Sequence, residues 1–179
     1  MKRIIWFMFT ITFVTVLSSS IGLPQEPPSQ WEVYFSPNGG STDAILKELS
    51  KAKSTLLVQA YSFTSAPIAK AVLSAHKRGV KVQVILDKGQ RKDKYSSATF
   101  FLNQGVPVRI DAKHAIAHNK VMIIDGETVI TGSSNFTKAA EENNAENLLV
   151  IRDNNLASLY MRNWQEHFQH SEVYAGRGR

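Results

Sequence analysis

The 179-residue sequence contains no cysteine. Disulfides, thiolate metal sites, a cysteine nucleophile and a lipid anchor on cysteine are therefore excluded. The absence of free thiols also suits an oxidising compartment. Internal repeats and low-complexity segments are missing as well. With 43% hydrophobic and 20% charged residues, the chain has the composition of one ordinary globular domain with a sizeable core.

Acidic residues are scarce, with 15 Asp and Glu against 21 Lys and Arg, and the net charge is +6. This balance favours a polyanionic partner, such as nucleic acid or an anionic membrane surface. Lys2 and Arg3 are the only charged residues among the first 22. Removing that segment would therefore lower the net charge by two and leave a modest basic bias.

The N-terminus has the pattern of a targeting segment. Lys2 and Arg3 precede an uncharged run from Ile4 to Leu17, and small residues follow it. This order is typical of a secretory signal, and it predicts a periplasmic or secreted protein. Residues 4–23 are uncharged throughout and reach the length of about 20 residues that a membrane helix needs, so an uncleaved anchor in the inner membrane is the alternative.

The remaining chain divides into three parts. Residues 23–30 are rich in proline and read as a linker, residues 31–170 as the globular domain, and residues 171–179 as a basic C-terminal tail. Strand-like and helix-like patterns alternate at short intervals through the domain. We therefore expect an α/β fold with a mixed β-sheet flanked by helices on both faces. The strands are expected at 31–35, 55–60, 80–86, 106–110, 120–124, 127–131 and 147–152.

A polar and mostly basic loop is expected at 87–94, directly after a strand. On charge alone it is a solvated surface loop. Its position at the carboxyl end of a strand, where the sites of open α/β sheets gather, supports a binding role instead. The candidate nucleic-acid-binding residues are Lys88, Arg91, Lys92 and Lys94.

The stretch from His118 to Phe136 holds the candidate site. Two β-branched apolar runs flank Asp125-Gly126, a pair that predicts a hairpin with a two-residue type I′ turn. In that register residue 124 pairs with 127 and His118 lies opposite Ser133. A slipped register would place Asn135 opposite His118. The turn places Asp125 at the far end of the hairpin, so we read it as a structural residue.

The polar residues at the open end of this hairpin suit phosphoryl chemistry. His118 can act as a nucleophile toward phosphorus, Lys120 supplies a positive charge, and Ser133 and Asn135 supply neutral donors. No carboxylate cluster or second histidine stands at metal-ligand spacing, so we expect a reaction with neither metal nor cofactor. His114 is read as an ordinary loop residue. On spacing alone, four surface residues at a hairpin end remain the alternative.

The same residues resemble a known signature. His118, Lys120, Asp125, Ser133 and Asn135 follow the pattern HxK(x4)D(x6)GSxN, which resembles the HKD motif of the phospholipase D superfamily. The continuation, Phe-Thr-Lys-Ala-Ala-Glu at 136–141 and Ala-Glu-Asn at 145–147, is similar to the small single-motif bacterial endonucleases of that superfamily. A looser likeness extends from about residue 32 to 168.

The resemblance implies a role for each residue. His118 would form a phosphohistidine or act as general acid, depending on the subunit. Lys120 and Asn135 would bind the phosphate, and Ser133 would support it or the histidine. Glu146 would match the acidic residue that orients the motif histidine from the next strand, and Asp125 is the aspartate of the signature.

The resemblance also implies a homodimer. Members of this superfamily use two HKD motifs in each active site, and this chain has one. The other histidines, at 76, 114, 167 and 170, lack the following x-Lys. Two copies of His118 across a twofold axis would supply the missing half.

Three functions follow from this sequence. The leading one is a non-specific, metal-independent endonuclease that hydrolyses DNA or RNA through a phosphohistidine. The second is a phospholipase D-type hydrolase of lipid head groups, which would gain support if residues 4–23 associate with a membrane. The third is a non-catalytic, basic nucleic-acid-binding module.

Overall fold

The computed structural model describes residues 30–177. The expected signal or anchor, nearly all of the linker and the last two residues lie outside this range. Within it, no helix is long and apolar enough to cross a membrane. The strands are β1 (Trp31–Ser36), β2 (Thr55–Ala60), β3 (Lys81–Asp87), β4 (Val108–Asp111), β5 (Lys120–Ile124), β6 (Thr128–Gly132), β7 (Glu146–Arg152) and β8 (Glu172–Val173). The helices are α1 (Ser41–Lys51), α2 (Ala66–Lys77), α3 (Ala98–Asn103), α4 (Lys138–Glu142) and α5 (Asn154–His170), with a 3₁₀ helix η1 (Lys88–Arg91).

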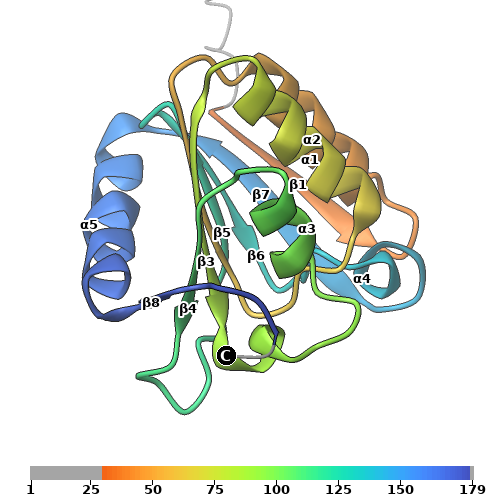
Figure 1. Ribbon diagram of the computed structural model, residues 1–179. Coiled ribbons are helices and arrows are strands. Elements are labelled where there is room, and N and C mark those ends of the chain that lie inside the picture. Colours follow the sequence, from red (N-terminus) through yellow and green to blue (C-terminus); the bar gives the residue numbers. More distant parts are fainter. Residues whose placement is uncertain (1–29, 178–179) are drawn as a thin grey trace, which may run out of the picture.

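The strands form one mixed sheet in the order β1-β7-β6-β5-β2-β3-β4-β8. Helix α5 packs on one face, and α1, α2 and α3 lie on the other (Figure 1). The expected α/β fold with helices on both faces is therefore confirmed. Strands β2, β3 and β4 are parallel to one another, while β5 runs antiparallel to β2 and β7 antiparallel to β6 and β1.

These directions bring the polar residues to one end of the sheet. The carboxyl ends of β1, β2, β3, β4 and β6 meet the amino ends of β5 and β7 there. We call this the polar end, and it is the lower end of the sheet in Figure 1. The two residues that begin β5 and β7 at the polar end are Lys120 and Glu146.

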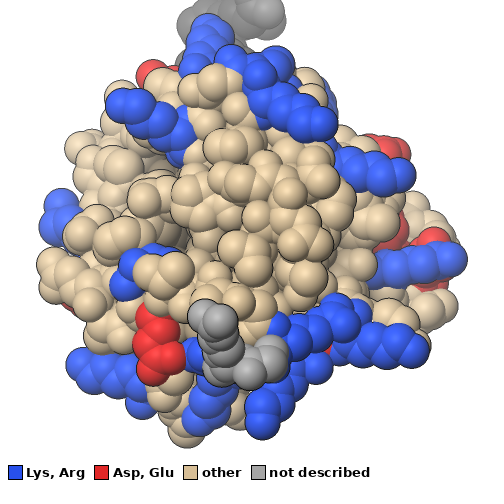
Figure 2. Space-filling model, viewed as in Figure 1, with Lys and Arg blue, Asp and Glu red and all other residues tan. Residues whose placement is uncertain are grey.

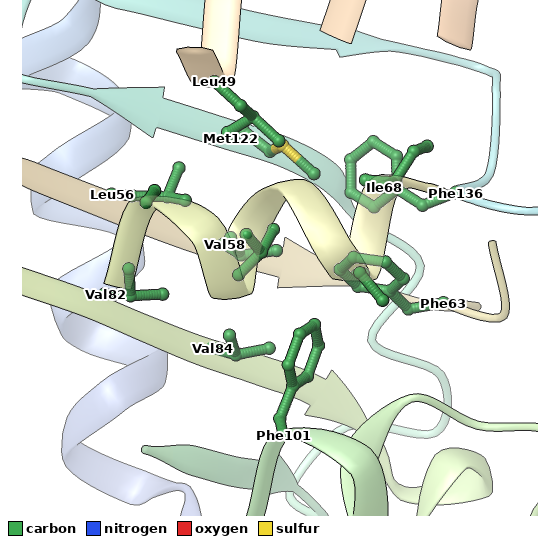
Figure 3. Packing of buried hydrophobic residues seen from close by; sticks show 14 of the residues in the cluster. Leu49, Leu56, Val58, Phe63, Ile68, Val82, Val84, Phe101, Met122 and Phe136 are labelled. Carbon is green, nitrogen blue, oxygen red and sulfur yellow. The ribbon is translucent and has the colours of Figure 1, made fainter. Parts of the chain in front are cut away.

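The larger core lies between the sheet and helices α1, α2 and α3, and alternate strand residues build it. Phe63 contacts Phe101 and Phe136 with ring centroids 5.2 and 5.4 Å apart (Figure 3). Each fully buried phenylalanine contributes about 1.5–3 kcal/mol. Phe63 and Phe136 also form an isolated bridge, so the segments that leave β2 and β6 are held side by side near the polar end.

The hairpin register differs from the expected one. Ile124 pairs with Thr128 instead of Glu127, so the loop has three residues, and both Asp125 and Gly126 have positive φ angles of 55° and 71°. The predicted two-residue turn is wrong by one position. The Glu127 N–H donates to the Ile124 carbonyl (3.0 Å), while the Glu127 carbonyl accepts from the Asp153 N–H (2.9 Å).

Side-chain carboxylates complete the first turns of two helices. Gly40 is the N-cap of α1, and it offers no side-chain acceptor. The Glu141 carboxylate caps the helix instead, because it accepts hydrogen bonds from the N–H groups of Gly40 (3.1 Å) and Thr42 (2.7 Å). At α5 the N-cap is Asp153, whose carboxylate accepts the Leu156 N–H at 2.9 Å.

The packed domain extends past residue 170. Strand β8 pairs with β4, and Tyr174 is only 1% exposed and belongs to the larger core. Its hydroxyl shares a hydrogen bond with Thr99 (2.8 Å). The segment from 171 to 174 is therefore part of the fold. The sequence had led us to expect a tail from residue 171 onward, so that boundary lies too early.

Asp125 anchors the hairpin loop to the start of β2. Its carboxylate accepts the N–H groups of Lys53, Ser54 and Thr55 at 2.8–2.9 Å, and the Ser54 hydroxyl at 2.9 Å. Burial alone would raise the pKa of this carboxyl, but the hydrogen bonds outweigh it and hold the pKa below its ordinary value. This end of the sheet is opposite to the polar end, so Asp125 contacts none of the candidate catalytic residues.

Replacing Asp125 by alanine should lower the free energy of unfolding by about 2–4 kcal/mol, because backbone donors lose a charged acceptor. Asparagine should cost about half as much, since its amide oxygen still accepts. Because the folded-state pKa is depressed, this stability is present above the ordinary pKa and is lost as the pH falls through the folded value. Urea denaturation at pH 7 and pH 3 tests this, and equal loss for the alanine variant at both pH values would contradict it.

Candidate active site

Lys120 is a buried lysine at the polar end. It begins β5, pairs with Ala60 at the carboxyl end of β2, and is 6% exposed. Its Nζ donates to the His118 carbonyl (2.9 Å) and lies 5.2 Å from the centre of the Tyr61 ring. The ammonium therefore fixes the backbone at His118 while remaining the positive charge of the site.

Glu146 is the carboxylate that acts electrostatically on Lys120. Lys120 lies on the face of β5 that Met122 shares, and Glu146 on the face of β7 that Leu148 shares, and both faces look toward α1 and α2. Burial lowers the pKa of Lys120, and the negative charge of Glu146 partly opposes that effect. Glu146 thus helps to keep Lys120 charged.

We expect the Lys120 ammonium to lose its proton below its ordinary pKa of 10.5. Glu146→Gln removes the opposing negative charge, so the pKa of Lys120 should fall further. An NMR titration of the lysine side chains measures this directly, and Lys120→Arg is the control, because it removes the Lys120 signal and so assigns it. An unmoved pKa in the glutamine variant would contradict the expectation.

His118 presents its imidazole to solvent at the polar end, two residues before β5. Its ring centroid lies 4.6 Å from that of Tyr61, with the ring planes 55° apart. Tyr61 follows β2 directly and was not among the expected site residues. Because it contacts both His118 and Lys120, Tyr61 helps to position these two side chains. Its place directly after a predicted strand was the sequence feature that could have identified it.

Ser133 and Asn135 follow β6 at the same end of the sheet. The Ser133 hydroxyl accepts the backbone N–H of Asn147 at 3.0 Å and its side-chain amide at 3.3 Å. Gly132 permits this approach, because a Cβ there would lie 2.3 Å from the Asn147 carbonyl oxygen, and its φ is 148°. The loop after β6 is therefore held tightly against β7.

Asn135 has a side-chain oxygen that is buried and has no hydrogen-bond partner. The two ends of an amide are assigned from their hydrogen bonds, and here nothing distinguishes them. With the amide rotated, the same position presents an N–H donor. An unpaired polar group at the polar end suits the binding of a phosphate oxygen.

The expected direct pairing of His118 with Ser133 does not form. At the polar end β5 pairs with β2 and β6 pairs with β7, while the β5–β6 ladder ends at Met122 and Ile130. The two halves of the HKD motif thus reach the same end of the sheet as separate strand ends. The residues brought there are His118, Lys120, Ser133, Asn135 and Glu146.

The expected basic loop forms η1 and the turn after it. Lys92 and Lys94 are exposed, whereas Lys88 donates to the His114 carbonyl (3.0 Å) and Arg91 pairs with Glu172. Figure 2 shows Lys and Arg side chains gathered along the lower edge of the face drawn, around the segment between β3 and α3. Buried Gln90 accepts the Phe63 N–H at 3.1 Å, which ties this segment to the strand exit beside the site.

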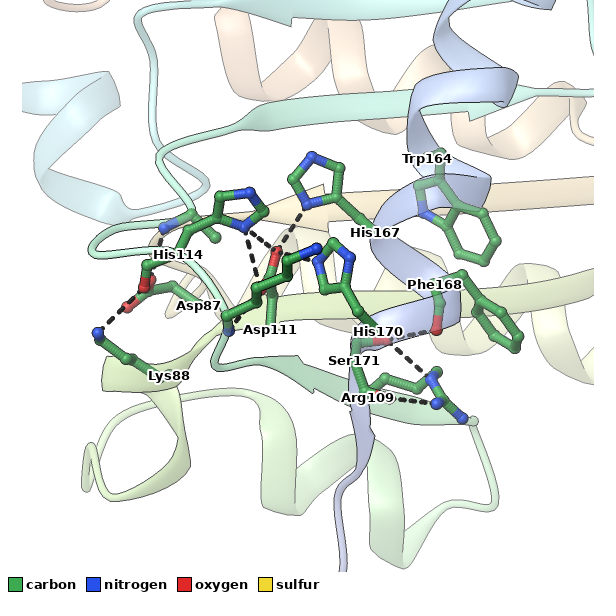
Figure 4. A network of polar contacts seen from close by, with 12 residues as sticks. Asp87, Lys88, Arg109, Asp111, His114, Trp164, His167, Phe168, His170 and Ser171 are labelled. Atoms are coloured by element: carbon green, nitrogen blue, oxygen red, sulfur yellow. Dashed lines mark hydrogen bonds and ion pairs between the residues drawn. The ribbon is translucent and has the colours of Figure 1, made fainter.

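The structure also reveals a cluster that the sequence did not predict. Asp111 ends β4 and is fully buried, and His114, His167 and His170 surround its carboxylate (Figure 4). Burial would raise the pKa of Asp111, but the three imidazoles beside its carboxylate, those of His167, His170 and His114, hold it well below its ordinary range. His114 is therefore more than an ordinary loop residue, and the expectation that no histidines stand at metal-ligand spacing is wrong. The available signal was the spacing of three between His167 and His170 on one helix.

The fold and the strand-end residues together define a phosphodiesterase-type hydrolase with one HKD motif per chain. The chain belongs to the phospholipase D superfamily: residues 45–169 match the family model described as "Cardiolipin synthase, PLD-like domain".

Three similar proteins agree with that assignment. The chain is 44% identical to "Phospholipase D" of Rickettsia conorii over 136 residues, which cover 76% of this chain and 68% of the relative. It is 31% identical to "Mitochondrial cardiolipin hydrolase" of Mus musculus over 169 residues, or 92% of this chain and 76% of the relative. Among solved structures it resembles Nuc from Salmonella typhimurium, a phospholipase D family member, with a TM-score of 0.77, 39% identity and coverage of 80% of this chain and 97% of that chain.

Proposed function

We propose that this hydrolase is a non-specific endonuclease that cuts DNA or RNA without a metal ion in the reaction. The observation that carries the proposal is the position of the exposed Lys92 and Lys94. They lie in the segment after β3, a strand that is two strands, or about 10 Å, from β5 across the sheet, and Gln90 ties this segment to Phe63 beside the site. A nucleic acid strand carries a phosphate every 3.4 Å of its axis, so it can occupy the site and the basic segment together.

In the proposed mechanism, two His118 residues share one phosphodiester. One imidazole attacks phosphorus, so that a P–N bond forms and a P–O bond breaks. The second, protonated imidazole gives its proton to the leaving oxygen. Water then attacks phosphorus, passes a proton to that second imidazole, and breaks the P–N bond. Lys120 and Asn135 bind the phosphoryl oxygens as negative charge develops on them.

This mechanism requires a homodimer. Each chain supplies one HKD motif, and His118 is the only histidine in the sequence with the x-Lys that follows. A twofold axis beside the polar end would bring two copies of His118 to one phosphate. Tyr61 and Glu146 of each chain would then hold their own His118 and Lys120 in place.

The first test compares substrates. The purified full chain is incubated in EDTA with plasmid, single-stranded DNA, RNA, phosphatidylcholine vesicles and cardiolipin vesicles. We expect cleavage of the nucleic acids. His118→Ala, purified in the same way, shows whether the activity belongs to this site and not to a contaminating nuclease. Lipid hydrolysis with intact nucleic acids would reject the proposal.

The second test measures salt dependence. Phosphate contacts release counterions, and each one contributes about 0.7–0.9 to the slope of log affinity against log salt. Lys92→Ala/Lys94→Ala should therefore reduce that slope by about 1.4–1.8. The matched control is Lys77→Ala/Lys81→Ala, which removes two exposed lysines at the opposite end of the sheet. An equal effect of both double variants would show that the segment after β3 is not the binding surface.

A phospholipid head group is the second candidate substrate. The observation that favours it is the 44% identity to a protein named Phospholipase D and the 31% identity to one named Mitochondrial cardiolipin hydrolase. The same two histidines would attack the phosphorus of a lipid phosphodiester. In that case vesicles should be hydrolysed in the first test, and the salt slope should not depend on Lys92 and Lys94.

A further inference from the structure

Three imidazoles converge on one carboxylate at the carboxyl end of β4. Oδ2 of Asp111 lies 2.6 Å from Nδ1 of His167, 3.0 Å from Nδ1 of His114 and 3.3 Å from Nε2 of His170. The four donor atoms all lie within 4.8 Å of one another. The ring centroids of the histidines are 4.8–5.2 Å apart, and Figure 4 shows the rings grouped around the end of Asp111.

We propose that Asp111, His114, His167 and His170 bind a divalent transition-metal ion, with Zn²⁺ as the best fit. Zinc takes four nitrogen and oxygen ligands at about 2.0–2.2 Å, which sets neighbouring ligand atoms about 3.3 Å apart. The distances from Asp111 run from 2.6 Å up to this value, so small outward shifts of the rings would make room for the ion. Imidazole nitrogen is a ligand for Zn²⁺, Cu²⁺ and Ni²⁺ and not for Mg²⁺ or Ca²⁺, which prefer oxygen.

Hydrogen bonding alone does not explain the cluster. His114 and His167 both hydrogen-bond to Asp111, and the Lys113 N–H donates to it as well (3.1 Å). Nε2 of His170 is buried and close to the same oxygen, but it makes no hydrogen bond. A buried ring nitrogen without a hydrogen bond is costly, and a cation placed between the rings would engage its lone pair.

The surroundings permit an ion to enter. A surface hollow is lined by the three histidines together with Lys113, Asn163 and Glu166. The His114 side chain is 43% exposed and those of His167 and His170 are 12% and 21% exposed, while Asp111 is inaccessible. Three of the four side chains are thus partly exposed, and the fourth anchors them from inside the fold, with its other oxygen held by the Lys113 N–H.

The ion would not take part in hydrolysis. Asp111 lies three strands from β5, which is about 14 Å across the sheet, and it points to the face covered by α5, whereas Lys120 lies on the other face. Instead, the ion would link three segments: the end of β4, the loop that leads to His118, and the last turns of α5. The loop is held elsewhere by the Ala117 N–H, which donates to Asp87 (2.8 Å).

The experiment measures metal binding and does not depend on activity. The full chain, without a histidine tag, is stripped with a chelator, transferred to chelator-free buffer and titrated with ZnCl₂ against a chromophoric zinc chelator. We expect one zinc per chain and, at about 100 times the Kd, a rise in Tm of about 5–10 °C. Co²⁺ in place of zinc should give the strong visible absorption of a four-coordinate ion.

Variants assign the site. His167→Gln/His170→Gln should weaken zinc binding by more than about 100-fold and remove the Tm rise. Where that double variant fails to fold, His114→Gln replaces an exposed loop side chain and should still weaken binding more than tenfold. His118→Ala should bind zinc as the wild type does. His76→Asn should also bind zinc normally, because His76 lies in the last turn of α2, away from the cluster.

Two results would overturn the proposal. One is the absence of stoichiometric zinc at about 100 μM free ion. The other is zinc binding at a different place, seen either as unchanged binding in the double variant or as binding lost only in His118→Ala. In either case the endonuclease proposal would stand, because the candidate active site shares no residue with this cluster.

Discussion

Replacing His118 by alanine should lower kcat/KM for phosphodiester hydrolysis by about 10⁴-fold or more. The imidazole is both the nucleophile and the general acid of the proposed mechanism, and residues that act as one unit lose most of the activity together. The side chain is exposed, so the change should leave Tm within about 1 °C. His76→Asn is the matched control, because it removes a histidine in the last turn of α2, far from the polar end.

A mixed dimer makes this test sharper. Two differently tagged chains, one wild type and one His118→Ala, are expressed together, and the heterodimer is purified through both tags. If two His118 residues serve one phosphate, the heterodimer should be nearly as inactive as the homodimer in which both chains carry His118→Ala. Half of the wild-type activity would show instead that each chain works alone, and the shared site would have to be abandoned.

Replacing Lys120 by methionine should reduce kcat/KM by about 10²–10³-fold, the usual loss when one preorganised donor to a developing negative charge is removed. Stability should not fall, and Tm should stay the same or rise. A buried ammonium is costly to desolvate, and methionine fills a similar space without charge. Loss of activity without loss of stability would separate a functional lysine from a structural one.

The control for Lys120 is Lys81→Met, which changes an exposed lysine at the first residue of β3 and should alter neither quantity. Steady-state kinetics and thermal unfolding on the same samples decide the question. Less than a tenfold loss for Lys120→Met would mean that the ammonium does not bind the phosphate. A marked fall in Tm would mean that its hydrogen bond to the His118 carbonyl is chiefly structural.

Local patterns predicted much of this fold. β5 begins and ends at the expected residues, 120 and 124, and all of its side chains are buried. β2 also begins and ends where expected, at 55 and 60, and most of its side chains are buried. The alternation of helices and strands was enough to predict the α/β class. The motif residues were found from their spacing, and the direction of the strands brings them to one end.

Contacts between distant segments account for what was missed. The hairpin loop took three residues because Asp125 binds the backbone of residues 53–55, which lie 70–72 positions earlier, and local turn preference cannot reveal that. Likewise the N-terminus of α1 is satisfied by Glu141, about a hundred residues away. The cluster around Asp111 needed the return of α5 to the end of β4, which no spacing in one sequence shows.

The pairing of β1 with β7 has a consequence for how the protein is made. Trp31 lies beside Ile151 and Ser36 beside Glu146, so partners are separated by more than a hundred residues. At synthesis rates of about 5–20 residues per second, β1 waits roughly 6–24 seconds for its partner to leave the ribosome. During this time β1 has no β7 beside it, and its Trp31 and Phe35 side chains, which are 57% and 66% accessible even in the finished fold, are more exposed still. The sheet can close only after nearly the whole domain has been translated, and the nascent chain must be kept from aggregating until then.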